Sequence, residues 1–313
     1  MVRALLSLVL PGVAASVAGA QQTLHWNNRV EQAVAEAKQT RKPLMFYVLS
    51  SEGDRADDME DAQRRAFAHP RVVEVARRFI PVQMSRSAHR DQLRRWRLPE
   101  KINQEVVFAT PERELIDPQS PTLAASGVAD PQVFIQKMVL VFRKYRDDLY
   151  RTELRAELTA ENAAAKDIRD VLKIVKEFLI LSADQDVAKL LENEKLDSGL
   201  RKQVYEVLAE LSTKPAVEAL LARAARDKEA AAALAQCTPA AAENLLEHLG
   251  GEDFNRHLLA YKTVTKVCKV PDTKPDRFWE GKNERLKTEE INRVREAVRQ
   301  TAARWRERYG DYR

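Results

Sequence analysis

The sequence has little cysteine and glycine, and each shortage excludes a class of protein. Only two cysteines, Cys237 and Cys268, occur in 313 residues, so a small domain held together by several disulfides is excluded. Nine glycines are present, and none forms a phosphate-binding loop or a Gly-x-Ser-x-Gly nucleophile elbow. The five histidines lack metal-ligand spacing, and no cofactor is expected.

Long hydrophobic runs are also missing after residue 20, which excludes a later membrane-spanning helix. The first 20 residues, MVRALLSLVLPGVAASVAGA, have one arginine, an apolar segment and a closing Ala-Gly-Ala triplet. This pattern is typical of a secretory signal peptide and predicts cleavage after Ala20. An uncleaved membrane anchor is the alternative, but the apolar segment is short and contains Pro11. We therefore expect an exported protein, periplasmic or secreted.

What the chain has in abundance is charge and helix-forming residues. Charged residues make up 32% of the sequence and the formal net charge is +5. Alanine, leucine, glutamate, arginine and lysine are frequent, which favours helices. The length allows two domains, each with its own core.

Strands and helices alternate in the first half of the sequence. An apolar stripe predicts a helix over 26–38, and LMFYVLS (44–50) and FIPVQMS (79–85) are typical of central strands. Residues 104–110 and 114–118 predict a hairpin. Asp130 and Pro131 suit the N-cap and first position of a helix that reaches about Leu149. This order predicts an α/β domain with a mixed sheet and flanking helices.

These segments resemble a thioredoxin-like domain, over residues 21–155. Trp26, the approach AVAEAKQTRKPLMFYVLSS, Met59 and VVFATPERELI carry the resemblance. The family's redox motif is absent, since the turn is Gly53-Asp54-Arg55-Ala56 and places Gly53 and Ala56 at the two cysteine positions. The family's cis-proline would fall near Gln104 and is also absent. Without a thiolate no thiol–disulfide exchange occurs at this turn, so no catalytic residue is assigned.

The second half, residues 156–313, is expected to be all-helical. Ser182-Ala183-Asp184-Gln185 is a candidate capping box, Lys214-Pro215 and Thr238-Pro239 are candidate helix starts, and Gly250-Gly251 a helix end. Short helices with a spacing of about 25–30 residues resemble HEAT-type repeats, which form an α-solenoid. A last helix over 289–309 would close the open end of the stack.

Two charged segments follow the degenerate turn. Asp54, Asp57, Asp58, Glu60 and Asp61 have the oxygen ligands that suit calcium or magnesium, but no calcium-loop glycine accompanies them, so we interpret them as helix-dipole partners. The segment Arg64–Arg97 is rich in arginine, and RRWR at 94–97 adds an aromatic side chain. The candidate anion-binding residues are Arg77, Arg78, Arg90, Arg94, Arg95 and Arg97.

Together these patterns predict a non-catalytic protein-interaction or scaffold protein of the cell envelope, with an unidentified protein partner and no nucleic acid. One alternative is a divergent thiol–disulfide or chaperone-like factor that uses Cys237 and Cys268. The two cysteines are interpreted as buried thiols, although a disulfide between them stays open. The other alternative is a protein that binds an anionic surface through Arg64–Arg97.

Overall fold

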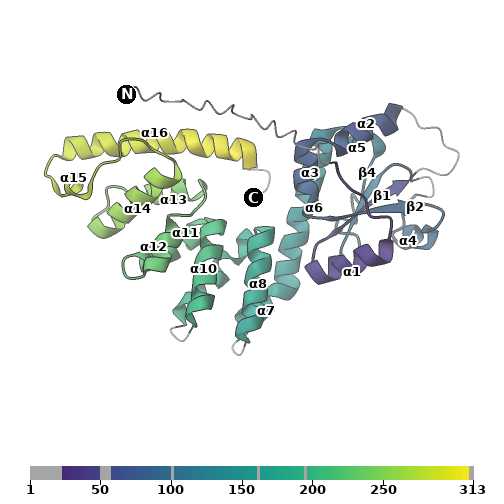
Figure 1. Ribbon diagram of the computed structural model, residues 1–313, viewed down its shortest axis with the longest axis horizontal. Helices are drawn as coiled ribbons and strands as arrows, with labels where there is room; N and C mark the ends of the chain where they lie inside the picture. The colour runs from purple at the N-terminus through teal and green to yellow at the C-terminus, as the bar shows by residue number, and fades with distance from the viewer. Residues whose placement is uncertain (1–22, 50–57, 100–101, 161–162, 194–195, 310–313) are drawn as a thin grey trace, which may run out of the picture.

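A computed structural model describes residues 23–49, 58–99, 102–160, 163–193 and 196–309 of the chain. The chain forms a small mixed sheet with flanking helices, followed by an array of helices that extends away from it (Figure 1). The expected signal peptide and the turn Gly53–Ala56 lie outside the described residues.

The sheet has four strands in the order β2-β1-β3-β4. β1 runs parallel to β2, with Leu44 opposite Ile80, and antiparallel to β3, with Leu44 opposite Ala109. Both segments predicted as central strands, 44–50 and 79–85, are strands, but only β1 is central, as an unbroken apolar run suits a strand covered on both faces. β2 lies at the edge of the sheet, and its residues alternate between buried and half-buried. The strands are β1 (Leu44–Leu49), β2 (Ile80–Ser85), β3 (Val106–Ala109) and β4 (Thr122–Leu123).

Helices cover both faces of this sheet. On one face, Phe46 and Val107 pack with residues of α1 and α4. On the other face, Met45 and Phe108 pack with residues of α3 and α6. The helices around the sheet are α1 (Val30–Thr40), α2 (Asp58–Phe67), α3 (Pro70–Ala76), α4 (Arg90–Arg95), α5 (Ala125–Ala129) and α6 (Pro131–Leu149).

Two predictions about this half need correction. The hairpin of 104–110 with 114–118 is reduced to a single bridge between Ala109 and Leu115, and β3 pairs instead with β4. The first helix begins at Val30, not near Trp26, because Asn27 forms a bridge with Val82 beside β2. In contrast, Asp130 caps α6 as predicted, since its side chain accepts from the backbone N–H groups of Gln132 and Val133.

A continuous helical segment joins the two halves. After α6 the chain continues without a break through a π-helical turn, η1 (Tyr150–Leu154), into α7 (Arg155–Thr159). Tyr150 donates a hydrogen bond of 2.8 Å to Asp186, which also accepts 2.9 Å from Arg155. The joint between the halves is therefore a helix held from its side and not an extended linker.

The hydrophobic core also crosses this joint. Aromatic rings follow one another from Phe108 on β3 through Phe79 to Phe142 on α6, and from there to Phe178 at the end of α8, with centroid separations of 5.4–5.8 Å. Buried residues from Met45 to Val298 belong to one cluster. The predicted boundary between residues 155 and 156 therefore falls inside a continuous helix and beside a shared core.

The second half is helical throughout its described residues, as expected. α10 packs against α8 and α12, and α11 packs against α12. Its elements are α8 (Ala165–Phe178), η2 (Leu181–Ala183), α9 (Asp184–Lys189), η3 (Leu190–Glu192), α10 (Ser198–Leu211), α11 (Lys214–Ala224), α12 (Lys228–Leu234), α13 (Ala241–Leu246), α14 (Phe254–Val267), α15 (Asp276–Glu280) and α16 (Glu284–Tyr309).

Helix boundaries in this half agree with the sequence only in part. α11 begins at Lys214 as predicted, and Thr213 caps it. The capping box at 182–185 is wrong, because Ser182 lies in the 3₁₀ turn η2 and α9 has no side-chain cap. α13 ends at Leu246, before the glycines, and α16 begins at Glu284, five residues earlier than expected.

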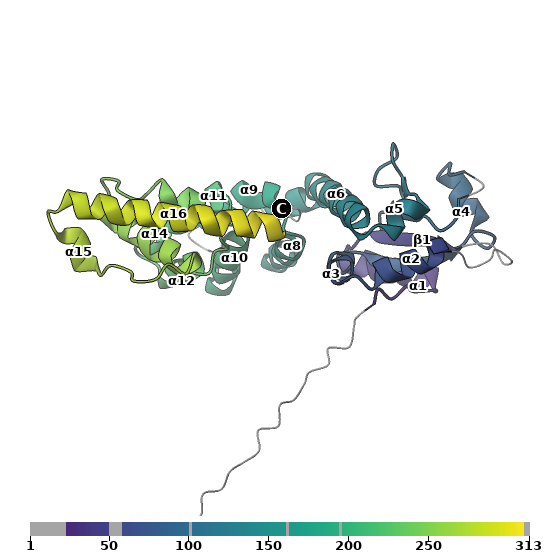
Figure 2. The same cartoon turned by 90° about the horizontal axis from the view of Figure 1, so that it is seen from above.

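The last helix returns along the array. Figures 1 and 2 show α16 lying lengthwise over the other helices, with its C-terminal end directed back toward the sheet. α16 packs on α13 and α14, and Arg306 near its end pairs with Glu243 of α13 at 3.0 Å. α16 thus runs back over its neighbours and does not continue the array.

Candidate functional site

The region around the degenerate redox turn contains a buried polar network. Gln63 of α2 is fully buried; its side-chain oxygen accepts from the Tyr47 hydroxyl at 2.7 Å. Its amide nitrogen donates to the carbonyls of Gln104 (2.9 Å) and Ala125 (3.0 Å). Gln104, at the expected cis-proline position, is left-handed with φ 54°, and the described residues contain no cis peptide bond. These contacts fix the packing of α2 against β1 and against the loop before β3.

The arginines of the basic segment lie on two separate surfaces. Arg77 and Arg78 follow α3, and the Arg78 guanidinium lies 5.5 Å from the Phe142 ring centroid of α6. Both ribbon views place α4 at the opposite end of the sheet from α3 (Figures 1 and 2). The residues on and next to α4 are exposed: Arg90, Arg94, Arg95 and Arg97.

The tryptophan of RRWR is not available for stacking on a ligand. Trp96 is buried, packs against Phe46, and donates from its indole nitrogen to the Arg113 carbonyl at 2.7 Å. Arg95 and Arg97, the residues before and after Trp96 in the sequence, are exposed, because successive residues at the end of a helix point in different directions. The aromatic part of the predicted anion site is therefore a core residue.

The acidic cluster pairs partly with the basic segment. Glu60 and Asp61 lie within 3.1 Å and 3.6 Å of the Arg64 guanidinium, one turn further along α2. Asp54 and Asp57 lie outside the described residues. Within the described ranges, no group of three or more histidine, cysteine, aspartate or glutamate side chains is arranged to hold a metal ion.

Both cysteines are free and buried, so the disulfide that the sequence left open is not formed. Burial raises the pKa of the Cys268 thiol to about 11, although Thr301 hydrogen-bonds to it. At pH 7 only roughly one such thiol in ten thousand is ionised, and the thiolate is the reactive form. A thiol–disulfide mechanism that starts at Cys268 therefore lacks its nucleophile.

We expect neither cysteine to react with a thiol reagent in the native protein at pH 7. The test compares 5,5′-dithiobis(2-nitrobenzoate) titration of the folded protein with titration in 6 M guanidinium chloride. Denaturation should release two thiols that the native titration does not detect. Rapid stoichiometric reaction of the folded protein would restore the redox alternative.

A cavity of about 390 Å³ lies beside the helical joint. The contacts of its lining residues hold neighbouring helices together. Tyr145 lines it and donates 2.6 Å to the Arg41 carbonyl. Burial, with Glu112 and Glu153, raises the pKa of the Tyr145 hydroxyl well above its usual range, so it stays protonated. Glu153 in turn pairs with Arg41 at 3.8 Å. These contacts tie α6 and η1 to the end of α1.

A smaller pocket at the far end of the helical array has different chemistry. This C-terminal pocket, of about 260 Å³, lies between α14, α15, α16 and the loop before α14. One exposed apolar side chain stands at it: Phe254, which lines the pocket, is 40% exposed. Its lining residues are Gly250, Gly251, Glu252, Phe254, His257, Trp279, Glu284, Lys287, Thr288 and Ile291.

His257 contributes a hydrogen-bond donor with no acceptor. Its ring is 5% exposed, and Nδ1 accepts a hydrogen bond of 2.9 Å from the backbone N–H of Gly250, a residue in a left-handed turn. Burial lowers the pKa of His257, and the nearby Lys287 lowers it further. The neutral ring therefore carries its proton on Nε2, and Nε2 has no partner among the described residues.

Trp279 contributes a second donor of the same kind. Its side chain is 3% exposed and stands edge-to-face with His257, with centroids 4.3 Å apart. The indole Nε1–H also lacks an acceptor within the described part of the chain. An aromatic face is only a weak acceptor, whereas an unsatisfied buried N–H costs about 1–3 kcal/mol. Two donors at one pocket are thus left in need of an acceptor.

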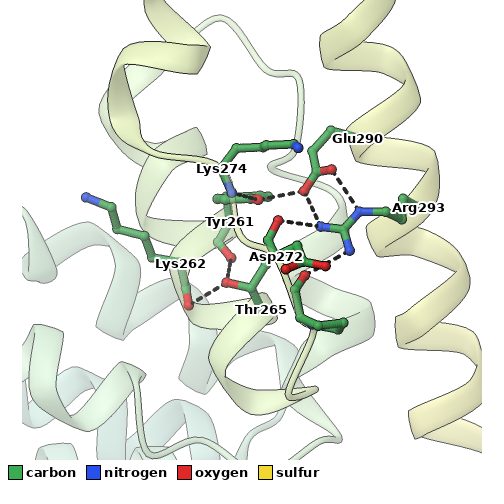
Figure 3. Close-up of polar contacts among 8 residues, drawn as sticks. Tyr261, Lys262, Thr265, Asp272, Lys274, Glu290 and Arg293 are labelled. Atoms are coloured by element: carbon green, nitrogen blue, oxygen red, sulfur yellow. Dashed lines mark hydrogen bonds and ion pairs between the residues drawn. The ribbon is translucent and has the colours of Figure 1, made fainter.

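A buried network holds the elements that form this pocket (Figure 3). The hydroxyl of Tyr261, on α14, donates 2.6 Å to Glu290 of α16 and accepts 2.7 Å from the backbone N–H of Lys274. Arg293 binds both oxygens of Glu290 at 2.8 Å and 2.6 Å, and also donates to the Pro271 carbonyl at 2.9 Å. We call these contacts the Tyr261–Glu290–Arg293 network.

The network has a defined charge state. Burial raises the pKa of Glu290, but hydrogen bonds from Arg293 and Tyr261 outweigh burial and hold that pKa below its usual range. Burial, together with the bond to Glu290, raises the pKa of the Tyr261 hydroxyl to about 12. A neutral phenol therefore donates to an ionised carboxylate, and every hydrogen-bonding group of Glu290 is used. The network is structural, and it fixes α16 and the connection to α15 against α14.

The sequence pattern does not single out this site. His257 is one of the five histidines without metal-ligand spacing, and neither Trp279 nor Lys287 belongs to a motif. The one available signal is the spacing of His257 and Tyr261 by four residues, which places a histidine on the apolar face of a helix. Nothing in the sequence shows that Trp279 lies beside it.

None of the helices in the described part of the chain is both long and apolar enough to cross a membrane.

No family model matches the sequence, and neither the curated proteins nor the solved structures contain a match to it.

Proposed function

We propose that this protein is a non-catalytic, exported binding protein of the cell envelope that docks a protein partner at its C-terminal pocket. The observation that carries the proposal is the pocket itself, where two buried N–H donors have no acceptor among the described residues and the exposed side chain of Phe254 lies beside them. Exposed apolar groups next to convergent polar groups are typical of binding sites.

The proposal includes a thioredoxin-like first half that has lost its chemistry. The parallel β1–β2 pair beside the antiparallel β3 and β4 supports that relationship, as do helices on both faces of the sheet. Gln63 and Gln104 join α2 to the loop before β3 through a hydrogen bond without any redox group. Such a unit is available as a rigid support for binding elsewhere.

The second half is proposed to be a short HEAT-like array that presents the pocket. Packing of α10 on α8 and of α11 on α12 supports this assignment, since repeat proteins stack neighbouring helices. The shared aromatic core supports a fixed position of this array relative to the sheet. A rigid array that presents the pocket in this way can bind a partner without catalysing a reaction and without a cofactor.

Site-specific photocrosslinking in the native envelope tests the proposal. p-Benzoylphenylalanine placed at position 254 or 288, two exposed positions that line the pocket, should give one common adduct to a partner protein. The same probe at position 202, an exposed lysine of α10, is the control and should not give it. Adducts that are the same from all three positions, or no adduct from 254 and 288, would contradict the proposed function.

A further inference from the structure

We propose that the C-terminal pocket binds the free C-terminal carboxylate of a polypeptide whose last side chain is apolar. This inference rests on the proposed function and names the part of the partner that the pocket recognises.

The hydrogen-bonding groups of the pocket select an acceptor. His257 Nε2–H and Trp279 Nε1–H are donors only, and neither has an acceptor within the described ranges. A carboxylate offers two oxygens and no hydrogen, so it satisfies both donors. A terminal amide offers one oxygen, and its NH₂ group would face a donor. The pocket should therefore distinguish a free C-terminus from an amidated one.

The charge that lowers the pKa of His257 is positive. Lys287 lines the pocket with a side chain that is 20% exposed, and it is the charge that acts on His257. Glu284, which pairs with Lys287 at 2.9 Å, is 78% exposed, and Glu252 is also exposed. Solvent screens these two carboxylates more than it screens the buried side of the pocket. The ammonium of Lys287 can exchange Glu284 for the carboxylate of a ligand.

The size of the pocket fits the end of a chain. Its volume of about 260 Å³ lies just below the ~300 Å³ at which pockets for drug-sized ligands begin. It is therefore too small for a nucleotide or an organic cofactor. Phe254 and Ile291 provide apolar surface for one side chain beside the donors.

Binding includes a local opening of the pocket. The two donor nitrogens have almost no exposed surface in the free chain, so an incoming carboxylate must displace side chains that cover them. Phe254, exposed at the mouth, and Lys287, paired with an exposed glutamate, are placed to move. The Tyr261–Glu290–Arg293 network keeps the backbone of α14 and α16 in place meanwhile.

The test uses the full chain and a fluorescein-labelled hexapeptide that ends in leucine. We expect the free-acid peptide to bind at least about tenfold more tightly than its C-terminal amide by fluorescence anisotropy, because charge-assisted hydrogen bonds are lost in the amide. Lys287→Ala should lower the affinity for the free-acid peptide by about tenfold and leave the affinity for the amide peptide unchanged. Lys202→Ala, on the exposed side of α10, is the matched control and should bind as the unmodified chain does.

A second measurement reports on the donors directly. In ¹⁵N–¹H spectra, the indole signal of Trp279, identified with Trp279→Phe, should move downfield on addition of the acid peptide only. Equal binding of acid and amide would overturn the inference. If 4-methylpentanoate binds and the peptide does not, the carboxylate that the pocket recognises does not belong to a polypeptide, and that part of the inference is wrong. Either result can occur while crosslinking at 254 and 288 still captures a partner, so failure of the inference is distinct from failure of the proposed function.

Discussion

Replacing Arg293 with alanine is expected to lower the free energy of unfolding by about 3 kcal/mol, the low end of the range for breaking a buried ion pair. The cost arises at Glu290, which is 4% exposed and would keep its charge while losing both bonds to the guanidinium. The low end applies because the Arg293 side chain is 37% exposed, so its removal admits water. Urea denaturation followed by circular dichroism measures the change.

Arg299→Ala on the same helix is the matched control. Arg299 also pairs with a glutamate three residues earlier, Glu296, but both side chains are exposed, at 75% and 58%. Such pairs contribute about 0.2–1 kcal/mol. The double variant Glu290→Met, Arg293→Met should recover most of the loss, because no unpaired charge stays buried. Equal effects of Arg293→Ala and Arg299→Ala would show that the network contributes no more than a surface pair.

Phe142→Ala is expected to destabilise the protein by about 3–5 kcal/mol, the usual cost of removing a buried aromatic side chain. Phe142 is 2% exposed and lies between Phe79, next to the sheet, and Phe178, in the helical array. Its loss leaves a cavity at the junction of the two halves. We therefore expect unfolding to separate into two steps, which urea titration with tryptophan fluorescence and circular dichroism would resolve as transitions that do not coincide.

Leu140→Ala provides the control on the same helix. Leu140 lies two residues before Phe142 on the opposite side of α6 and is 62% exposed, so its truncation should change stability by less than about 0.5 kcal/mol. A single coincident transition in Phe142→Ala, with a loss no larger than in Leu140→Ala, would show that the halves are not coupled through this ring.

The parts of the fold that the sequence predicted are those fixed by local pattern. β1 follows from an unbroken apolar run, β2 from the apolar residues of FIPVQMS, and α6 from Asp130 with Pro131 and a long apolar stripe. The predicted hairpin forms only at its turn, where the Thr110 N–H donates to the Glu114 carbonyl and Ala109 bridges Leu115. The longer partner of β3 on this side is β4, a two-residue strand with no sequence pattern of its own. The prediction of a capping box was wrong because Ser182 lies inside the 3₁₀ turn η2 and not at a helix N-cap.

The candidate site depends on contacts that no local pattern contains. His257 and Trp279 come from different helices and meet only because the connection between them folds back under the Tyr261–Glu290–Arg293 network. The basic segment shows the opposite case: its arginines are close in sequence, yet α3 and α4 place them at different ends of the sheet. Spatial proximity could be inferred from the sequence in neither case.

The reversal of α16 determines how the array can vary in length. A helix of 26 residues, roughly 39 Å long, packs on α13 and α14 and pairs with α13 near its end. An open-ended stack tolerates the insertion of another helix pair, because each repeat contacts only its neighbours. Here an insertion between α14 and α16 would carry Glu290 away from Tyr261 and Arg306 away from Glu243. Duplication of helix pairs is therefore compatible with this architecture only upstream of α13.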